Sequence, residues 1–517
     1  MGGMIYDFVI IGSGFGGSVS ALRLSEKGYK VLVIEQGKDY SDNNFARTNW
    51  NLKKWLWLPL IRCFGIQKIT FLRHISVLSG VGVGGGSLVF AGVLEKPKQA
   101  FFKQGSWAGL EDWQRELDPY YEKALIMMGG AKTPLMQEAD EALLKLAERK
   151  GKEKSFSPTT CAIFFGSPDK SVSDPFFNGE GPDRTGCTFC GSCMTGCRVN
   201  AKNSLDKNYL YLATKKGAKV LPETRVTSVM PEGIRGSNGY KIACKSSTKF
   251  TRQKEIIQTR RVIFSGGVMG TVKLLLRLKK TTLPDLSNQV GHLIRTNNEA
   301  LIMNTTWHRN KQLWKGVSIG SILQLDDNSH VEPVRYGKGS GFWRIMMMPM
   351  VNEKRMLPRV LKLLLLPWKS PVRWAKVFFT PDFGKSTSII LFMQHLESTL
   401  IFTRSWFGLS SRVKKGKAPT AFIPEAHAAA REYADILGAK SQVAVNETLT
   451  GIPSTAHILG GACMGNSIEE GVIDKDNKVF GYDNMYVFDG SMISSNPGVN
   501  PSLTIAAITE RGVAKIP

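Results

Sequence analysis

The sequence predicts an α/β fold in which a Rossmann-like, doubly wound domain is joined to a second domain with an antiparallel β-sheet and helices. Two large domains are expected because 517 residues exceed the roughly 250–300 residues at which single hydrophobic cores stop growing. The chain opens with a strand, a glycine turn, a helix and another strand, whereas residues 299–440 show strand alternation with irregular insertions. Apolar residues make up 42% and charged residues 21%, a balance typical of a folded chain and not of a disordered one.

The N-terminal segment has the pattern of a dinucleotide-binding turn. The apolar run 8–11 predicts a buried parallel strand, and residues 18–27 predict a helix. The next strand, residues 31–34, ends in Glu35. Glycines at this spacing let the backbone approach a pyrophosphate, while Glu35 accepts from a ribose hydroxyl and argues against a 2′-phosphate. The turn residues assigned to the dinucleotide are Gly12, Gly14, Phe15, Gly16 and Gly17. The turn alone does not distinguish NAD from FAD.

A second glycine-rich turn, within residues 80–87, is a candidate for contact with another part of the same cofactor. Its backbone amides would lie against a second anionic or planar group, and the residues concerned are Gly84, Gly85, Gly86 and Ser87. An ordinary glycine-rich surface loop is the alternative.

The remaining elements follow from periodicity. Residues 101–150 alternate aromatic and leucine side chains with charge at helical spacing, and residues 219–262 predict short strands. A helix is expected at 271–278, after a strand and a turn. The chain ends in glycine-rich turns and a helix that follows Asn500 and Pro501.

Two polar residues near the C-terminus are candidates for chemistry, although each also has a structural interpretation. His457 lies among small residues, and a lone histidine is usually structural. Asn500 precedes Pro501, and Asn before Pro is a common way to begin a helix. Taken singly, neither residue requires a function.

Four of the eight cysteines fall within residues 187–197, and this clustering favours a metal over disulfides in a chain without a secretory signal. The spacing of Cys187, Cys190, Cys193 and Cys197 is that of a ferredoxin-type iron-sulfur loop. Arg198 stands where such loops have Pro, and no second cysteine run exists. A cluster completed by Cys161 or Cys463, or a three-iron form, therefore stays open. Zinc or another structural metal and reduced thiols are the alternatives.

Together these segments resemble the glucose-methanol-choline oxidoreductases in order and spacing over nearly the whole chain. The resemblance rests on the opening unit, the turn at 84–87, residues 262–276 and the tail at 474–505. Within this family, residues 80–89, the cysteine window and residues 457–461 look most like the cholesterol oxidase branch, which includes bacterial members with a cysteine-rich insert. The chain departs from that branch at Phe90, where sterol oxidases have Asn after the glycine turn.

The resemblance implies bound FAD, with the pyrophosphate at the first glycine turn, a ribose at Glu35 and the isoalloxazine near the second glycine turn. It also assigns to the cofactor Val226, Gly266, Asp489, Gly490, Asn500 and Pro501. His457 and Asn500 match the family's catalytic pair, which reverses their structural interpretation. His457 would accept or orient the proton of the substrate hydroxyl while a hydride leaves the carbon for flavin N5. Asn500 would donate a hydrogen bond to the same oxygen.

The function that the resemblance implies is FAD-dependent oxidation of a sterol-like or other lipophilic secondary alcohol, with oxygen or a one-electron carrier as acceptor. One alternative is a dehydrogenase of a polar alcohol or sugar that passes electrons through an iron-sulfur cluster. A second alternative, from a different class, is a non-catalytic flavin electron carrier at a membrane surface.

We expect a discontinuous domain organisation. The FAD-binding domain is assigned to residues 1–100, 200–298 and 441–517. The substrate-binding domain is assigned to residues 101–199 and 299–440, with the cysteine loop at 187–197 and a basic, apolar lid at 352–379.

The net charge of +25 and the pI near 9.7 indicate attraction to an acidic partner, but charge alone does not separate nucleic acid, an anionic membrane and an acidic redox protein. Residues 354–376 hold seven Lys or Arg and no acid, interleaved with leucine and tryptophan, which suits an anionic membrane surface. The alternative is a lid that packs on its own domain. Segment 51–73 would form the opposite edge of the same entrance. Since no apolar run is long enough to span a membrane, we expect a cytoplasmic protein. It would be peripheral to a membrane if the basic segment meets lipid, and we expect no nucleic-acid partner.

Overall fold

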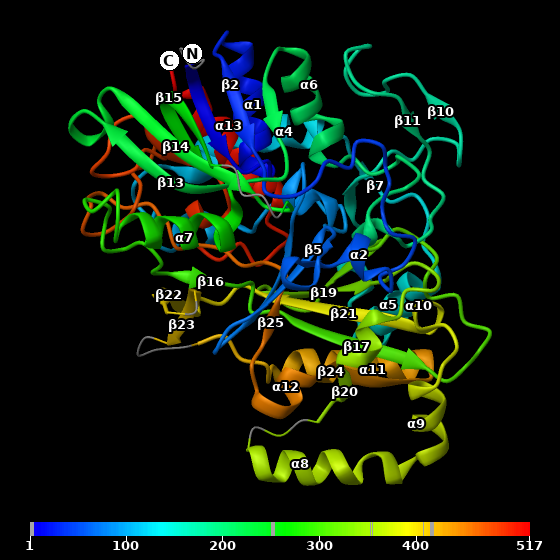
Figure 1. Ribbon diagram of the computed structural model, residues 1–517. Coiled ribbons are helices and arrows are strands. Elements are labelled where there is room, and N and C mark those ends of the chain that lie inside the picture. The colour runs from blue at the N-terminus through cyan, green and yellow to red at the C-terminus, as the bar shows by residue number, and fades with distance from the viewer. Residues whose placement is uncertain (1–4, 250–253, 352, 354, 407, 414–417) are drawn as a thin grey trace.

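The computed structural model describes residues 5–249, 254–351, 353, 355–406, 408–413 and 418–517, and within them two seven-stranded sheets dominate the architecture (Figure 1). The first sheet runs in the order β12 (Lys219–Leu221), β2 (Val31–Ile34), β1 (Tyr6–Ile11), β15 (Lys254–Phe264), β14 (Gly239–Ser246), β13 (Thr224–Glu232), with β26 (Met485–Val487) paired to β15. Strands β12, β2, β1, β15 and β26 pair in parallel, and β15, β14 and β13 form an antiparallel meander. The fold class predicted from the sequence is confirmed.

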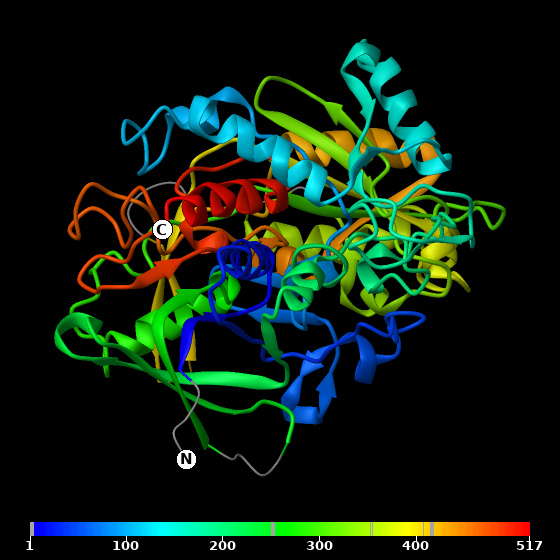
Figure 2. The same cartoon turned by 90° about the horizontal axis from the view of Figure 1, so that it is seen from above.

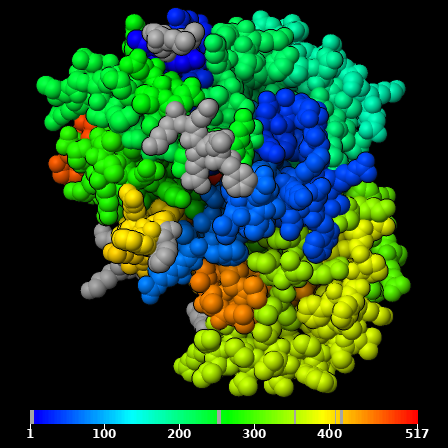
Figure 3. Space-filling model, viewed as in Figure 1, coloured from blue at the N-terminus to red at the C-terminus, as the bar shows by residue number. Residues whose placement is uncertain are grey.

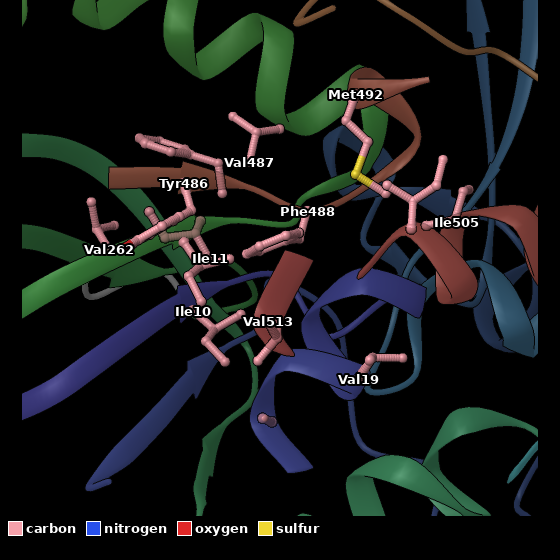
Figure 4. Packing of buried hydrophobic residues seen from close by; sticks show 14 of the residues in the cluster. Ile10, Ile11, Val19, Val262, Tyr486, Val487, Phe488, Met492, Ile505 and Val513 are labelled. Atoms are coloured by element: carbon pink, nitrogen blue, oxygen red, sulfur yellow. The ribbon is translucent and has the colours of Figure 1, made fainter. Parts of the chain in front are cut away.

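Continuous apolar runs explain why the central strands pair in parallel and are covered on both faces. Strand β2 is buried throughout, and β1 is buried from Phe8 to Ile11. The helices α1 (Phe15–Glu26) and α13 (Ser502–Ala514) pack together, and α13 also contacts α4 (Trp113–Met127). Figure 2 shows α13, in red, between the blue α1 and the cyan α4. Figure 4 shows how Ile10, Val19, Phe488 and Val513 fill the space between sheet and helices.

The second sheet is antiparallel and presents one face to helices and the other to a cavity. Its order is β20 (Met347–Pro349), β24 (Ala439–Ala444), β17 (Ala300–Thr306), β21 (Thr387–Gln394), β19 (Ser329–Val334), β18 (Ser321–Gln324), β8 (Phe156–Pro158). The helices α5 (Glu138–Arg149) and α11 (Pro424–Leu437) cover one face. Because side chains alternate along a strand, Ile302 and Ile390 pack under these helices, whereas Leu301 and Leu391 line the cavity.

Shorter elements border or connect the two sheets. They are α2 (Leu52–Trp55), β3 (Trp57–Leu58), β4 (Cys63–Phe64), β5 (Gln67–Phe71), β6 (Ser76–Gly80), α3 (Gln99–Lys103), β7 (Gly130–Lys132), β9 (Thr160–Ala162), β10 (Ser171–Val172), β11 (Arg184–Thr185), α6 (Tyr209–Lys215), α7 (Gly267–Leu278), β16 (Ile294–Arg295), α8 (Met356–Leu365), α9 (Pro371–Phe378), α10 (Phe383–Ser386), β22 (Thr399–Ser405), β23 (Gly408–Val413), α12 (Val445–Thr450) and β25 (Ser454–Thr455). In the part of the chain that the structure describes, no helix has the length and apolar composition needed to cross a bilayer.

Several element limits differ from those expected. Helix α1 begins at Phe15 and not at residue 18, because its N-cap is Gly14 within the glycine turn. The strands expected between 219 and 262 are longer than predicted, since β13 and β15 extend into a meander. Strand β24 crosses the expected domain boundary at 440/441, and Trp113 belongs to the same core as the first sheet. The division into two domains therefore stays a prediction.

Candidate active site

A cavity of about 1010 Å³ lies between the two sheets and gathers most of the residues that the sequence singled out. Its wall includes the first glycine turn, the ends of parallel strands and the apolar face of the antiparallel sheet. This volume is at the upper end of that of ligand sites, as expected of a cavity that holds a cofactor together with a substrate.

The first glycine turn forms one end of the cavity. Gly12 has φ +109°, and a Cβ atom there would lie 2.3 Å from the Ser265 carbonyl oxygen. The first N–H groups of an α-helix have no partner within the helix, and the N-cap of α1, Gly14, has no side chain that could accept from them. These N–H groups and the helix dipole together suit a pyrophosphate.

Ser13 joins the two glycine turns to Glu35. The Gly84 N–H donates to Ser13 Oγ at 3.1 Å, and Ser13 Oγ donates to Glu35 Oε2 at 2.8 Å. The other carboxylate oxygen of Glu35 accepts from Gly37 N at 2.9 Å. Burial raises the pKa of Glu35, and these hydrogen bonds oppose that effect. The two predicted cofactor turns are therefore one unit of structure, and Glu35 lines the cavity at the end of β2.

The structure brings the other predicted cofactor residues to the same wall. Those that line the cavity are Gly12, Gly14, Phe15, Gly16, Glu35, Gly85, Gly86, Val226, Gly266, Asp489, Gly490, Asn500 and Pro501. Gly17, Gly84 and Ser87 lie in the same turns but are not part of the lining. Phe90 also lines the cavity, where its ring packs edge-on against Phe15 with centroids 5.6 Å apart. An apolar ring contact thus occupies position 90, at which the chain departs from the pattern that the resemblance implied.

His457 is held by a buried carboxylate. The ring Nδ1 lies 2.5 Å from Glu299 Oε2, and the other oxygen of Glu299 accepts from the backbone N–H of His457 at 3.2 Å. Thr455 and the Ala456 N–H donate to that same oxygen. Both the ring and the backbone of this segment are therefore oriented by one side chain, which comes from the start of β17.

The two charges of this pair stabilise each other. Burial by itself lowers the pKa of His457, but the Glu299 carboxylate, with a smaller contribution from Glu332, outweighs burial and raises it. Burial by itself raises the pKa of Glu299, but the His457 ring and the hydrogen bonds outweigh burial and lower it. Glu299 is thus ionised when the ring becomes protonated.

Asn500 lies in the cavity wall with a second buried carboxylate behind it. Its Nδ2 donates to Glu332 Oε2 at 3.4 Å, and its Oδ1 has no protein partner. His330 lies on the far side of Glu332, with its Nε2 3.6 Å from Oε1. Asn500 therefore has hydrogen-bonding capacity left for a molecule in the cavity.

Three acids in and behind the wall are absent from the sequence-based prediction. Glu299 and Glu332 lie on or beside strands of the second sheet, and Glu447 lines the cavity from α12. Burial raises the pKa of Glu447 to about 8. Glu332 lies between Val331 and Pro333 in a strand that is buried throughout, and an acid with apolar neighbours on both sides is a signal that could have identified it.

The cysteine window forms a separate small cavity of about 20 Å³, which Cys187, Cys190, Cys193 and Cys197 all line. Backbone N–H groups donate to two of the sulfurs, from Phe189 to Cys187 at 3.4 Å and from Ala201 to Cys197 at 3.3 Å. The expected extra ligands Cys161 and Cys463 do not line this cavity.

The arrangement of the thiols does not fit a single metal ion. Among the described residues, no three His, Cys, Asp or Glu side chains are placed to hold one. All eight cysteines have free thiols. The zinc alternative thus lacks support, and an iron-sulfur cluster is not shown.

Family models match two large parts of the chain. Residues 6–278 and residues 404–509 each match a model described as GMC oxidoreductase.

The similar proteins include two cholesterol oxidases. One, from Acinetobacter baumannii, is 40% identical over 99% of this chain and 94% of the relative. The other, from Mycobacterium tuberculosis, is 40% identical over 99% of this chain and 91% of the relative. The solved structure of pyridoxine 4-oxidase from Mesorbium loti covers 99% of both chains with a TM-score of 0.60 and 13% identity, and so supports the fold alone.

Proposed function

Because the chain belongs to the GMC oxidoreductase family, we propose that it oxidises a sterol-like or other lipophilic secondary alcohol by hydride transfer to FAD. The observation that supports this most is the presence of the dinucleotide turn, His457 and Asn500 in the wall of one cavity. The two relatives named cholesterol oxidase support the class of substrate.

The substrate side of the cavity is apolar, which favours a lipophilic alcohol over a sugar. Its wall in the second sheet consists of Leu301, Met303, Val334, Ile389 and Leu391, with Met346, Met347 and Trp343 beside them. A polyol would leave its hydroxyl groups without partners against such a wall, and unpaired polar groups are costly in an apolar site.

His457 is oriented to take the hydroxyl proton. Its Nδ1 is occupied by Glu299, so Nε2 is the nitrogen left for the substrate. In the neutral ring Nδ1 carries the proton that is donated to Glu299, and Nε2 accepts the proton of the alcohol. Glu299 then stabilises the positive charge that forms on the ring.

Asn500 positions the same oxygen. One N–H of its amide faces Glu332, and the other can donate to the alcohol oxygen as the carbon loses its hydride. FAD, when bound, supplies the hydride acceptor. The tight glycine turns and the uncapped N-terminus of α1 fit its pyrophosphate.

Anaerobic flavin reduction tests the proposal. A 3β-hydroxysterol in detergent should bleach the flavin absorbance, whereas glucose should not. The variants H457Q and N500A should retain FAD and reduce the bleaching rate by roughly 10²–10⁴. Bleaching by glucose alone would favour the polar-alcohol dehydrogenase, and bound FAD that no alcohol bleaches would favour the non-catalytic carrier.

We propose in addition that Cys187, Cys190, Cys193 and Cys197 would hold an iron-sulfur cluster, which would supply a one-electron acceptor on the side of the large cavity. The observation in favour is that Cys193 lines the small cavity while the next residue, Met194, lines the large one. Lys202 connects the two regions, since its Nζ donates to the carbonyl of Cys193 at 2.7 Å and to that of Phe90, which lines the large cavity, at 3.3 Å. In a cluster each thiolate binds a different iron, so ligands that suit no single ion are still compatible with it.

Metal analysis tests the cluster separately from catalysis. Protein prepared anaerobically should contain iron and acid-labile sulfide together, and C190S should lose both while FAD stays bound. The variant C244S is the control, because Cys244 lies in β14, away from the loop. Absence of iron from anaerobic preparations would contradict the cluster and leave oxygen as the acceptor.

A further inference from the structure

Helix α8 buries a charged side chain and exposes most of its large apolar ones. Its single buried residue is Arg359. Four of its five leucines and its methionine are 60–79% exposed, whereas Leu363 is half-buried; the exposed ones are Met356, Leu357, Leu361, Leu364 and Leu365. A helix that packs on its own protein normally buries the apolar side chains and exposes the arginine.

The orientation of α8 is fixed by that buried arginine. Arg359 donates to the carbonyls of Glu353 and Leu449, each at 3.3 Å, and its guanidinium lies over the Phe422 ring at 4.8 Å. These contacts hold the helix against α12 with the leucines outward. The exposed apolar surface is therefore a consequence of specific contacts and not of a loosely attached segment.

The exposed surface continues beyond α8. Trp368 is 79% exposed in the turn that follows, and Val372 in α9 is exposed as well, whereas Trp374 and Val377 anchor α9 to the fold. We call these residues the apolar ridge: the five exposed side chains of α8 together with Trp368 and Val372. Single exposed apolar residues are normal on a protein surface, but a series of seven along one segment is not.

Cations alternate with the apolar ridge along the chain. Arg355, Lys362, Lys369, Arg373 and Lys376 follow one another with no acid between them. Lys362 pairs with Glu353 at 2.8 Å, and Glu353 precedes this basic run. Lys354, which belongs to the basic segment expected from the sequence, lies outside the described residues. An apolar ridge edged with Lys and Arg matches a bilayer with anionic headgroups.

The apolar ridge lies next to the substrate side of the cavity. Helix α12, against which α8 packs, supplies Asn446 and Glu447 to the cavity wall. Figure 3 shows α12, in orange, between the blue β5 and β6 region and the yellow-green α8 and α9. In the blue region Leu58 and Phe71 line the cavity and are also exposed.

We propose that the apolar ridge docks on an anionic lipid bilayer, with its leucines and Trp368 below the headgroups and its cations at the lipid phosphates. Docking holds the neighbouring mouth of the cavity at the membrane surface. A second copy of the chain is a poorer occupant, because a two-fold contact through this ridge would place like charges against each other. The docking does not depend on the identity of the substrate. A lipophilic substrate would only explain why docking is useful to the enzyme.

Co-sedimentation with vesicles that contain no sterol tests the docking. Full-length protein with FAD should bind phosphatidylcholine vesicles containing phosphatidylglycerol and bind pure phosphatidylcholine weakly. Added salt should weaken the binding because it screens the cations. The double variant L361S/L364S should lose at least about tenfold in partitioning, since its apolar anchor is removed.

Two further double variants separate the contribution of the cations to vesicle binding from that of the exposed apolar side chains. K369Q/K376Q should lose roughly fivefold per cation on anionic vesicles only. The control I126S/I234S removes two exposed apolar side chains outside the apolar ridge and should bind like the wild type.

Three outcomes would overturn the proposal: binding indifferent to lipid charge, binding unchanged in L361S/L364S, or a dimer in sedimentation velocity that L361S/L364S dissociates. Turnover of detergent-solubilised sterol, measured in parallel, reports on the catalytic proposal alone.

Discussion

The two ends of the large cavity are built in different ways. The end that we propose for the cofactor is lined largely by backbone, within turns whose residues are neighbours in sequence, such as the turn from Gly12 to Gly17. The end that we propose to be catalytic is built from side chains of four distant segments, at Glu299, Glu332, His457 and Asn500. A binding site made of backbone depends on glycine at particular positions of one turn. A site made of side chains depends on which distant strands and loops the topology brings together.

The largest effect is expected at the cofactor end, from G12A. A Cβ atom at Gly12 would lie 2.3 Å from the Ser265 carbonyl oxygen, and φ of +109° is strained for any residue with a side chain. Backbone strain alone should cost about 1–3 kcal/mol. Denaturant unfolding and FAD content should both show the loss. G14A is the matched control for stability, since its Cβ would approach Ser265 O only to 3.9 Å. If G12A matched G14A in stability and FAD content, the account of the turn would be wrong.

An intermediate effect is expected at the catalytic end, from E299Q. The substitution removes the charge that raises the pKa of His457, so burial should then dominate and lower it. Because the base must be neutral, the acid limb of the pH–rate profile should move to lower pH. The rate above that limb should fall by roughly 10²–10⁴, because Glu299 no longer stabilises the charge that forms on the ring.

Single-turnover flavin reduction across pH measures both effects of E299Q. E332Q is the comparison, since Glu332 contributes less to the pKa of His457 and should move the limb less. An unmoved acid limb in E299Q would show that His457 is not the titrating base.

The smallest effect is expected from E447Q, in the same wall. Burial raises the pKa of Glu447 to about 8, so this carboxyl group is neutral near pH 7 and its amide replacement should leave turnover unchanged. The folded-state pKa lies above the unfolded value, so the wild type should lose stability as pH rises from the ordinary range of a glutamate towards 8. E447Q should lack that loss. Unfolding at about pH 5 and about pH 9 tests this, and equal pH slopes in the two proteins would contradict it.

The sequence predicted the residues that line the cavity better than the buried residues that hold them in place. The glycine turns, Glu35, His457 and Asn500 all reach one cavity, as the resemblance implied. Glu299 escaped prediction because it is 158 residues from His457 and nothing local marks it. The cysteine spacing predicted a shared location, which Cys187 to Cys197 have, but spacing says nothing of the distances between sulfurs. The sequence also predicted the basic, apolar character of residues 354–376, but it did not predict which face of α8 would be exposed.

The sequence by itself determined the fold class and the position of the dinucleotide turn. Both follow from local rules, since apolar runs specify buried strands and only glycine permits the close approach and positive φ at Gly12. Tertiary structure decided which carboxylate raises the pKa of His457. It also decided that α8 buries Arg359 and exposes most of its leucines. Those outcomes depend on contacts between segments far apart in the chain. A periodic pattern shows that a helix has two faces, and only the packing of Arg359 against α12 and Phe422 decides which of them meets water or lipid.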